Sequence, residues 1–571
     1  MSREKSLQKA IVLSLMLTNI WCGAAYADNG ADGADGTKPP PKTDAIGSGG
    51  LTADYTDSAN NGANGGTGTR PNLSSGGGKG GHGGDISSAH TVSGTVSGAI
   101  SITAAAGNGG KGGDSPYGSG DLNYTFGGNG GSGGNVELGL TVTGTAFDGQ
   151  KITLTAAGGS GGNGGSSTGY GDSLGSDRNN KGGQGGNGGD ASAKGLILTG
   201  DAAQTTVTVA DIAITATGGK GGNNGSSYDA AAIVPGSGGA AAAYGITSVA
   251  AGKATITAAN ITIEAAGGNG GDAGAKSSFY KGDPVPEIDS GGEAKATAAY
   301  GLQAQNGDIA LTAQAVSVTA TGGNGGAGGG NGAINNKEGS NPGESLTAFK
   351  GGIGAVGGAA YAAAFALQGS VADLKATTVV STAVGGVGGS GGIGANSFNT
   401  SIKYDGGEGG TGGQGGTAEA KGLSVIAGNV ILQATAVAAT ATGGAGGAGG
   451  AGSKGGNGGK GSTGGNGGNA YARAVSAAGG TAELTVDTIT ASAAGGAKGD
   501  GGNGGANESG EHYGGAGTSG SIAAEAKAYG IYAEKGAVVN LRAQTPNGTD
   551  VETAAKAAED KLNDIFDTMI S

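Results

Sequence analysis

The stretch Ala315–Gly329, AVSVTATGGNGGAGG, decides the fold of this chain. Its first half alternates, with Val316, Val318 and Ala320 on one face and hydroxyl-bearing residues between them, which predicts a half-buried β-strand. From Gly322 onward the period changes from two residues to three, in G-G-N and G-G-A triplets. The same switch recurs along the chain, and repetition on this scale predicts stacked supersecondary units.

The composition points to one thin, repetitive body. Of 571 residues, 139 are Gly and only 10 are Pro, while aromatic residues make up 4%. Collagen-like and proline-rich chains are therefore excluded, and large side chains are too few for several thick globular cores. Intrinsic disorder is the competing interpretation, but strict alternation in register is not expected of a disordered tract. The net charge of −13 disfavours nucleic acid as a partner, because phosphate contacts need a basic surface.

The first segment reads as an export signal. Residues 1–27 combine a basic start, the apolar run Ala10–Ile20 and an A-x-A cleavage site ending at Ala27, which predicts a secretory signal peptide. Acylation of Cys22, as in a lipoprotein, is the alternative. The signal carries a net +2, so its removal changes the charge from −13 to −15. The mature chain then has no Cys for disulfides or thiolate metal sites, and no later stretch is long and apolar enough to predict a transmembrane helix.

The remaining chain divides into three parts. Residues 28–84 are predicted to be a low-complexity linker. Residues 85–546 carry nine repeats and predict an all-β solenoid, or β-helix, with glycine-rich inserts. Residues 547–571 predict a short amphipathic helix, because Thr549 and Glu552 fit a capping box and an apolar face follows. This helix is expected to cap the last coil, with a docking or export signal as the alternative.

The register of the repeats is strongly specified. In the fifth repeat, GLQAQ, IALTAQ and AVSVTATGG predict three short strands, with a turn at Asn306-Gly307-Asp308. A one-residue slip would turn the inner residues of the last strand to solvent. These inner residues recur as Ile152/Leu154/Ala156, Ile212/Ile214/Ala216, Ile261/Ile263/Ala265, Val316/Val318/Ala320, Val379/Ser381/Ala383 and Val437/Ala439/Ala441. Because the last member is Ala, we expect a thin core that tapers toward the glycines.

The glycine inserts come as pairs of arms, one leaving a strand and one returning to the next repeat. Polyproline II has three residues per turn and no internal hydrogen bonds, so a G-G-x repeat places glycine on two of three faces and lets backbones approach closely. Ordering so many glycines is costly in entropy, so the arms are expected to be ordered only if they bundle laterally. Flexible linkers are the alternative, although a linker does not require a three-residue period.

Between the arms lie non-repetitive tips at Ser115–Phe126, Ser166–Lys181, Lys276–Ser290, Gly332–Lys350 and Ala395–Asp405. Variable tips on a repetitive scaffold are the usual place for recognition. The aromatic residues of these tips are the candidate ligand contacts: Tyr117, Tyr124, Phe126, Tyr170, Phe279, Tyr280, Phe349, Phe398 and Tyr404.

Chemical motifs are few, and we predict neither catalysis nor a cofactor. The motif GGxGxD occurs four times, ending at Asp85, Asp114, Asp190 and Asp272, and is typical of calcium-binding nonapeptide repeats. The copies never run in tandem and lack the apolar residue expected two places after the Asp, so calcium is disfavoured and an Asp that caps the next strand is preferred. The three histidines, His82, His90 and His512, lack ligand spacing and are expected to be solvated.

Threonine rows raise one further alternative. Pairs such as Thr206/Thr208, Thr215/Thr217 and Thr255/Thr257 could form a flat hydroxyl array, as in ice-binding solenoids. Threonine is also simply a favourable residue on an exposed strand. Ice binding is therefore kept as a less favoured hypothesis.

The repeat AYGLQAQNGDIALTAQAVSVTATGG resembles the passenger regions of bacterial autotransporter adhesins. The arms, such as GGNGGKGSTGGNGG at Gly455–Gly468, are similar in composition and period to glycine-rich mycobacterial PGRS proteins and to phage tail-tip adhesins with polyproline II sandwiches. The autotransporter resemblance implies display of a binding solenoid outside a Gram-negative-type cell. That family ends in a translocating β-barrel, whereas this sequence ends at Ser571, which implies a separate outer-membrane export partner or a truncated chain.

The sequence thus leads to one functional hypothesis and its alternatives. We expect a non-enzymatic, exported bacterial surface protein whose tips bind a glycan or protein ligand on a host or neighbouring cell. A structural surface coat without a specific ligand is the alternative, and an ice-binding solenoid is less favoured.

Overall fold

The computed structural model describes most of the repeat region. The described residues are 33–37, 45–46, 55–58, 77–92, 98–115, 126–143, 146–167, 182–199, 204–226, 233–248, 252–275, 289–330, 334–335, 350–398, 406–455, 458–506, 514–522, 524–534 and 536–542. The predicted signal peptide and the predicted C-terminal helix lie outside them.

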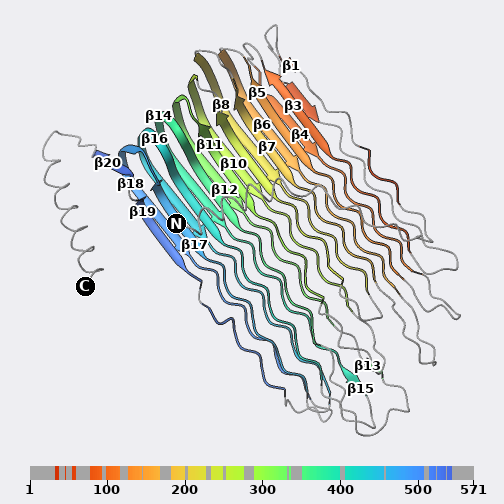
Figure 1. The fold of residues 1–571 in the computed structure, drawn as a ribbon. Coiled ribbons are helices and arrows are strands. Elements are labelled where there is room, and N and C mark those ends of the chain that lie inside the picture. Colours follow the sequence, from red (N-terminus) through yellow and green to blue (C-terminus); the bar gives the residue numbers. More distant parts are fainter. Residues whose placement is uncertain are drawn as a thin grey trace, which may run out of the picture.

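The described part is an all-β solenoid in which paired strands run parallel. The first column of strands comprises β1 (Ala45–Ile46), β3 (Ile86–Val92), β5 (Val136–Val142), β7 (Ala191–Leu198), β9 (Ala241–Ser248), β11 (Thr297–Gln305), the first parts of β14 (Ala360–Val384) and β16 (Ala418–Thr442), β17 (Ala470–Ala477) and β19 (Ala526–Ala533). The second column comprises β2 (Tyr55–Ser58), β4 (Ile100–Ala105), β6 (Ala146–Ala157), β8 (Gln204–Thr217), β10 (Lys253–Ala266), β12 (Asp308–Thr321), the remainders of β14 and β16, β18 (Thr481–Ala494) and β20 (Val538–Arg542). Figure 1 shows these strands stacked side by side in chain order.

Nine coils from β3–β4 to β19–β20 match the nine predicted repeats within the described residues. Pairing already begins before Asp85, because β1 pairs with β3 and β2 pairs with β4. The stretch predicted as a linker therefore contributes two short strands to the solenoid.

A corner inside the second-column strand gives each coil its three sides. In β12, the buried residues are at positions 309, 311 and 313 and then at 316, 318 and 320, so the inward phase shifts by one residue at Gln314. The pairing with β10 skips the same position. The structure therefore joins the second and third predicted strands into one element that bends between them, and the turn before it is made by Asn306 and Gly307, both with positive φ.

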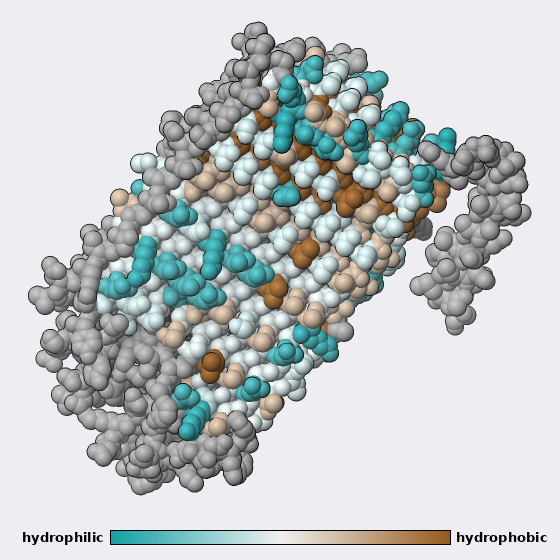
Figure 2. Space-filling view, turned by 180° about the vertical axis from the view of Figure 1, so that it is seen from behind, coloured by the Kyte–Doolittle hydropathy of each residue, from teal (hydrophilic) through white to brown (hydrophobic). Residues whose placement is uncertain are grey.

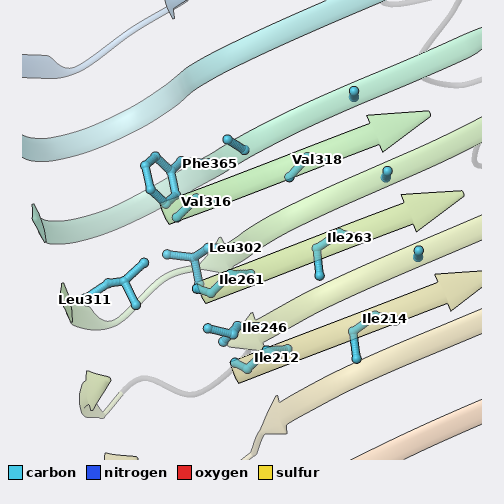
Figure 3. Packing of buried hydrophobic residues seen from close by; sticks show 14 of the residues in the cluster. Ile212, Ile214, Ile246, Ile261, Ile263, Leu302, Leu311, Val316, Val318 and Phe365 are labelled. Atoms are coloured by element: carbon cyan, nitrogen blue, oxygen red, sulfur yellow. The ribbon is translucent and has the colours of Figure 1, made fainter. Parts of the chain in front are cut away.

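The core is a ladder of aliphatic residues, as predicted. Ile212, Ile261 and Val316 are in register on neighbouring coils, and so are Ile214, Ile263 and Val318. All the predicted inner sets are buried, including the small ones of the sixth and seventh repeats. Figure 3 shows these side chains stacked from coil to coil and meeting first-column residues such as Leu302 and Phe365. The core narrows to alanine where the arms begin.

The glycine of the recurring Ala-Tyr-Gly motif, as at Gly245 and Gly301, lets the sides of the coil approach. A Cβ at Gly301 would lie 2.5 Å from the Ala364 carbonyl oxygen and 3.0 Å from Cγ1 of Val316. In the same way, a Cβ at Gly245 would lie 2.7 Å from Cδ1 of Ile263. The glycine is therefore required by packing between two sides of one coil.

The glycine arms form a two-layered sandwich that extends from the solenoid (Figure 1). In the outward arm at 385–394, the first glycine of each triplet donates to the next outward arm, as in Gly388 N to Ala445 O at 2.8 Å. The second glycine donates to a return arm in the other layer, as in Gly386 N to Gly358 O at 2.9 Å. The third residue, which we call the outer position, faces away from the sandwich. The predicted lateral bundling is confirmed for the described arms.

Candidate functional site

The outer positions of the arms carry a ladder of side-chain hydrogen bonds. The backbone N–H of Val387 donates to Oδ1 of Asn324 at 2.9 Å, and the N–H of Asn324 donates to Oδ1 of Asn269 at 2.8 Å. Each outer residue therefore has its amide directed along the surface toward the preceding arm. Asn is frequent at these positions because its side chain satisfies that amide, which would otherwise depend on water.

The aspartates of the GGxGxD motifs belong to the same ladder. Asp85 Oδ1 accepts from Asn135 N at 2.7 Å, and Asp190 Oδ1 accepts from Ala240 N at 2.8 Å, directly before β5 and β9. Asp114 and Asp272 accept in the same way from residues of neighbouring arms. These carboxylates bind backbone amides one coil away, which accounts for the motif without calcium.

On the outward arms of coils six and seven, most side chains at the outer positions are apolar instead of polar or charged. The outward arms at 385–394 and 443–453 carry Val387, Ser390 and Ile393, followed by alanines at 445, 448 and 451. Val387 is 43% exposed and Ile393 is 57% exposed. Neither side chain can accept a hydrogen bond, so the facing amides of the next arm are left to solvent or to a partner. Figure 2 shows one face of the molecule, on which polar side chains form several separate groups among pale rows with isolated apolar side chains.

Rows of threonine side chains, which we call threonine ranks, run across the outer face of the second-column strands from coil to coil. One rank is in register from coil to coil and comprises Thr103, Thr155, Thr215, Glu264, Thr319, Thr382, Thr440 and Ser492. Neighbouring members are spaced by about 4.8 Å, the strand spacing of a sheet. Of the predicted pairs, Thr215/Thr217 lies in this surface, whereas Thr206/Thr208 and Thr255/Thr257 form a shorter row before the corner. Glu264 interrupts the hydroxyl rank.

A row of tyrosines lines the first-column strands. The rings of Tyr244 and Tyr300 stack with centroids 5.2 Å apart, and the centroid of Tyr361 lies 5.4 Å from that of Tyr300. Burial raises the pKa of all three phenols. Tyr244 and Tyr300 each precede a glycine and are in register on neighbouring coils, whereas Tyr361 precedes Ala362 and is in register with Ala298.

The tyrosine row continues into an ionic cluster. Lys421 lies over the Tyr361 ring at 5.3 Å, and Glu419 pairs with Lys421 at 3.0 Å and with Arg473 at 2.8 Å. Arg473 in turn lies over the Tyr532 ring at 4.5 Å. These contacts link coils six to nine on one face. They give the tyrosine row a structural role, because each side chain contacts one on a neighbouring coil.

The predicted ligand contacts fall mostly outside the described residues. Phe126 is 40% exposed, and its carbonyl accepts from Gly77 N at 2.8 Å. Phe398 belongs to β15 (Ser397–Phe398), which pairs with β13 (Ile334–Asn335) of the preceding tip. The other candidates lie outside the described part of the chain: Tyr117, Tyr124, Tyr170, Phe279, Tyr280, Phe349 and Tyr404.

The described ends of successive outward arms adjoin one another. Ser115 and Ser167 form a parallel bridge between the first two tips, and β13 and β15 do the same further along. The structure therefore brings tip segments about 50 to 60 residues apart in sequence to one edge, in coil order.

The histidine prediction is wrong for His90. His90 is fully buried on the inner face of β3, and its Nε2 lies 2.7 Å from Ser88 Oγ. Ile86 and Val92 face inward on the same strand, and His90 lies an even number of residues from each, so its side chain also points inward. His82 is exposed, and its Nδ1 accepts from Ser132 N at 3.0 Å, while His512 lies outside the described residues.

Among the described residues, no three His, Cys, Asp or Glu side chains are grouped so that they could hold a metal ion. No helix there is long and apolar enough to cross a membrane.

Comparison with known proteins gives little guidance. No family model and no curated protein matches this chain. Among solved structures, the chain is similar to an antifreeze protein of the springtail Granisotoma rainieri, described as a bundle of nine polyproline type II helices whose crystal waters match the ice lattice. The match is 24% identical, covers 34% of this chain and 91% of that protein, and has a TM-score of 0.10. A TM-score this low carries no argument about fold or function.

Proposed function

We propose that this chain is an exported bacterial surface protein that binds a host or neighbouring cell through the tips of its glycine arms. The observation that supports the proposal is the hydrogen bonding between arms. Flexible linkers would let each tip move independently, whereas these arms are bonded to both layers at every triplet, as at Gly386 and Gly388. A nine-residue arm reaches about 28 Å at polyproline II spacing, so the tips stand well away from the β-core.

The adjoining tip segments suit an extended ligand. Exposed Phe126 and the paired strands β13 and β15 lie at arm ends, where a long edge can offer many weak contacts at once. Linked weak contacts raise the overall affinity for a multivalent surface, such as a cell-surface glycan or protein array. An outer-membrane export partner is part of this proposal.

Cell binding by the purified mature protein tests the proposal. Replacing Tyr124, Phe126 and Tyr404 together by Ala is expected to abolish binding. The matched control replaces Val371 and Ile426, which are 53% and 42% exposed near the turn between the two columns, by Ala. Unchanged binding by the tip variant would overturn tip recognition, and absence of binding by the unmodified protein would favour a structural coat.

The threonine rank supports ice binding as a second candidate function. Its hydroxyls lie in register on a flat face, as at Thr319, Thr382 and Thr440. Thermal hysteresis of the mature protein tests this candidate, and Thr382→Tyr should abolish the effect by raising a ring above the plane. No hysteresis in the unmodified protein would eliminate ice binding.

A further inference from the structure

An uncharged surface lies on the outward-arm layer of coils six and seven and extends onto coil eight as far as Ala497, where Lys498 and Asp500 end it. We call it the neutral patch and define it by Val380, Val384, Val387, Ser390, Ile393, Ala438, Thr440, Thr442, Ala445, Ala448, Ala451, Ala494 and Ala497. It has no Asp, Glu, Lys or Arg, although the chain contains 44 acidic and 31 basic residues. Val380, Val387 and Ile393 are 38%, 43% and 57% exposed. A contiguous apolar surface of this kind marks an interaction site.

The dimensions of the neutral patch can be worked out from the strand and arm geometry. From Val380 to Ile393 it runs about 40 Å, at roughly 3.3 Å per strand residue and 3.1 Å per arm residue. Three coils at about 4.8 Å give a width of about 14 Å as far as Ala497, and the two coils beyond it give about 10 Å. The projected area is therefore roughly 500 Å² per copy, smaller than the ~800 Å² that each partner contributes to a standard interface.

The neutral patch has a strand half, at residues 380–384, 438–442 and 494, and an arm half, at residues 387–393, 445–451 and 497. The two halves carry complementary hydrogen-bonding groups. On the arm half, the amides of Ala445 and Ala451 face the side chains of Val387 and Ile393, which offer no acceptor. On the strand half, Thr440 and Thr442 present hydroxyls, which can accept hydrogen bonds. The arm half thus offers donors between methyl groups, and the strand half offers acceptors.

We propose that the neutral patch is a dimer interface occupied by the same patch of a second copy. A two-fold axis parallel to the solenoid axis places the strand half of one copy over the arm half of the other, so hydroxyls meet amides. Both copies have the same coil spacing, so contacts repeat in register across the three coils. Such an interface is self-complementary, as a two-fold dimer requires.

Other parts of the sandwich fit a second copy less well. Earlier outward arms carry exposed Lys111, Lys220 and Asp272 at outer positions. The return-arm layer opposite the patch carries Glu408 and Lys460. Burying these charges between identical faces would cost desolvation energy that neutral side chains avoid.

Sedimentation velocity of the full-length mature chain tests the proposal. The unmodified protein is expected to be a dimer, and Val387→Lys with Ile393→Lys should raise the dissociation constant at least 100-fold. The control, Gln414→Lys with Thr417→Lys, places the same charge on outer positions of the opposite layer and should remain dimeric. An unmodified protein that stays monomeric at about 100 μM would overturn the proposal, and so would equal dissociation of the control.

Cysteine trapping tests the geometry independently of stability. The midpoint of the patch falls near Val387, so Val387→Cys should form an intermolecular disulfide in the mature chain, which has no other Cys. Ile393→Cys alone should not, because the two-fold axis places it opposite the strand half. Efficient trapping through Ile393→Cys alone, or none through Val387→Cys, would overturn this arrangement.

Discussion

The inward glycines of the sandwich allow a sharp test of the packing argument. At Gly447, a Cβ would lie 1.9 Å from the carbonyl oxygen of Gly389 and 2.5 Å from its carbon. That oxygen already accepts from Gly413 N at 2.7 Å. Gly447→Ala must therefore push two arms apart by more than 1 Å, since ordinary carbon–oxygen contacts begin at about 3.4 Å.

The cost follows from the bonds that this movement breaks. The bonds Gly447 N to Gly413 O and Gly413 N to Gly389 O measure 2.8 and 2.7 Å and would be lost. At about 1 kcal/mol each, with overpacking strain of about 1–3 kcal/mol, Gly447→Ala should destabilise the sandwich by about 3–5 kcal/mol. The chain itself has Ala at two glycine positions, with different results: the bond from Ala294 N to Val356 O is 3.4 Å long, whereas Ala355 N donates to Gly326 O at 2.9 Å.

The matched control is Gly515→Ala. No atom lies within 4 Å of a Cβ at Gly515 in the described structure. This variant should be neutral or stabilised by about 0.5 kcal/mol, because Ala restricts the unfolded chain more than Gly does. Guanidinium titration followed by circular dichroism measures the difference, and hydrogen exchange at 443–453 localises it, since long repeat arrays need not unfold in two states. Equal stability of the two variants would refute the close-packing argument.

Three further outcomes are expected. Asn324→Ala should cost about 1 kcal/mol in chemical denaturation because Val387 N loses its acceptor, whereas Asn503→Ala, on the last described outward arm, should cost nothing measurable. Ile263→Ala should lower the free energy of unfolding by about 2–5 kcal/mol because it leaves a cavity in the core, and a loss below 1 kcal/mol would contradict the tight packing around Ile263. Burial raises the pKa of Tyr300, so the folded state favours the neutral phenol, and its stabilising effect is present below pH 10 and declines as pH rises further. Tyr300→Phe should reduce the alkaline slope of unfolding free energy by about 1.4 kcal/mol per pH unit just above pH 10, and an unchanged slope would contradict burial of the ring.

The sequence was sufficient for the architecture because its two periods are geometric. A period of two requires a strand with one buried face, and the inner sets ending in Ala156, Ala216 and Ala265 fix one register for all coils. A period of three with two glycines leaves two faces on which backbones can touch. Lateral bundling could therefore be predicted, because isolated polyproline II arms would have no contacts to offset the conformational entropy lost when their glycines are ordered.

The candidate surfaces were less predictable. The role of Asn324 and Asp190 as amide acceptors depends on which arms adjoin, and the adjoining residues are 49 to 63 positions away in the sequence. The strand boundary predicted after Gln314 is in the structure a one-residue shift within β12, which divides that strand between two sides of the coil. His90 appeared solvated because its strand has a weak apolar pattern, with Ser88 at another inner position.

The sequence alone therefore determined the strands, their register and the three-residue arms, because these depend on spacing along one segment. Tertiary structure alone decided which outer amides have acceptors, where the charged rows stop and which coils carry the neutral patch. Those properties depend on pairs of residues one coil apart, such as Asn324 with Val387 and Val387 with Ala445. The stacking of coils creates these pairs, and insert lengths that vary from repeat to repeat conceal them in the linear sequence.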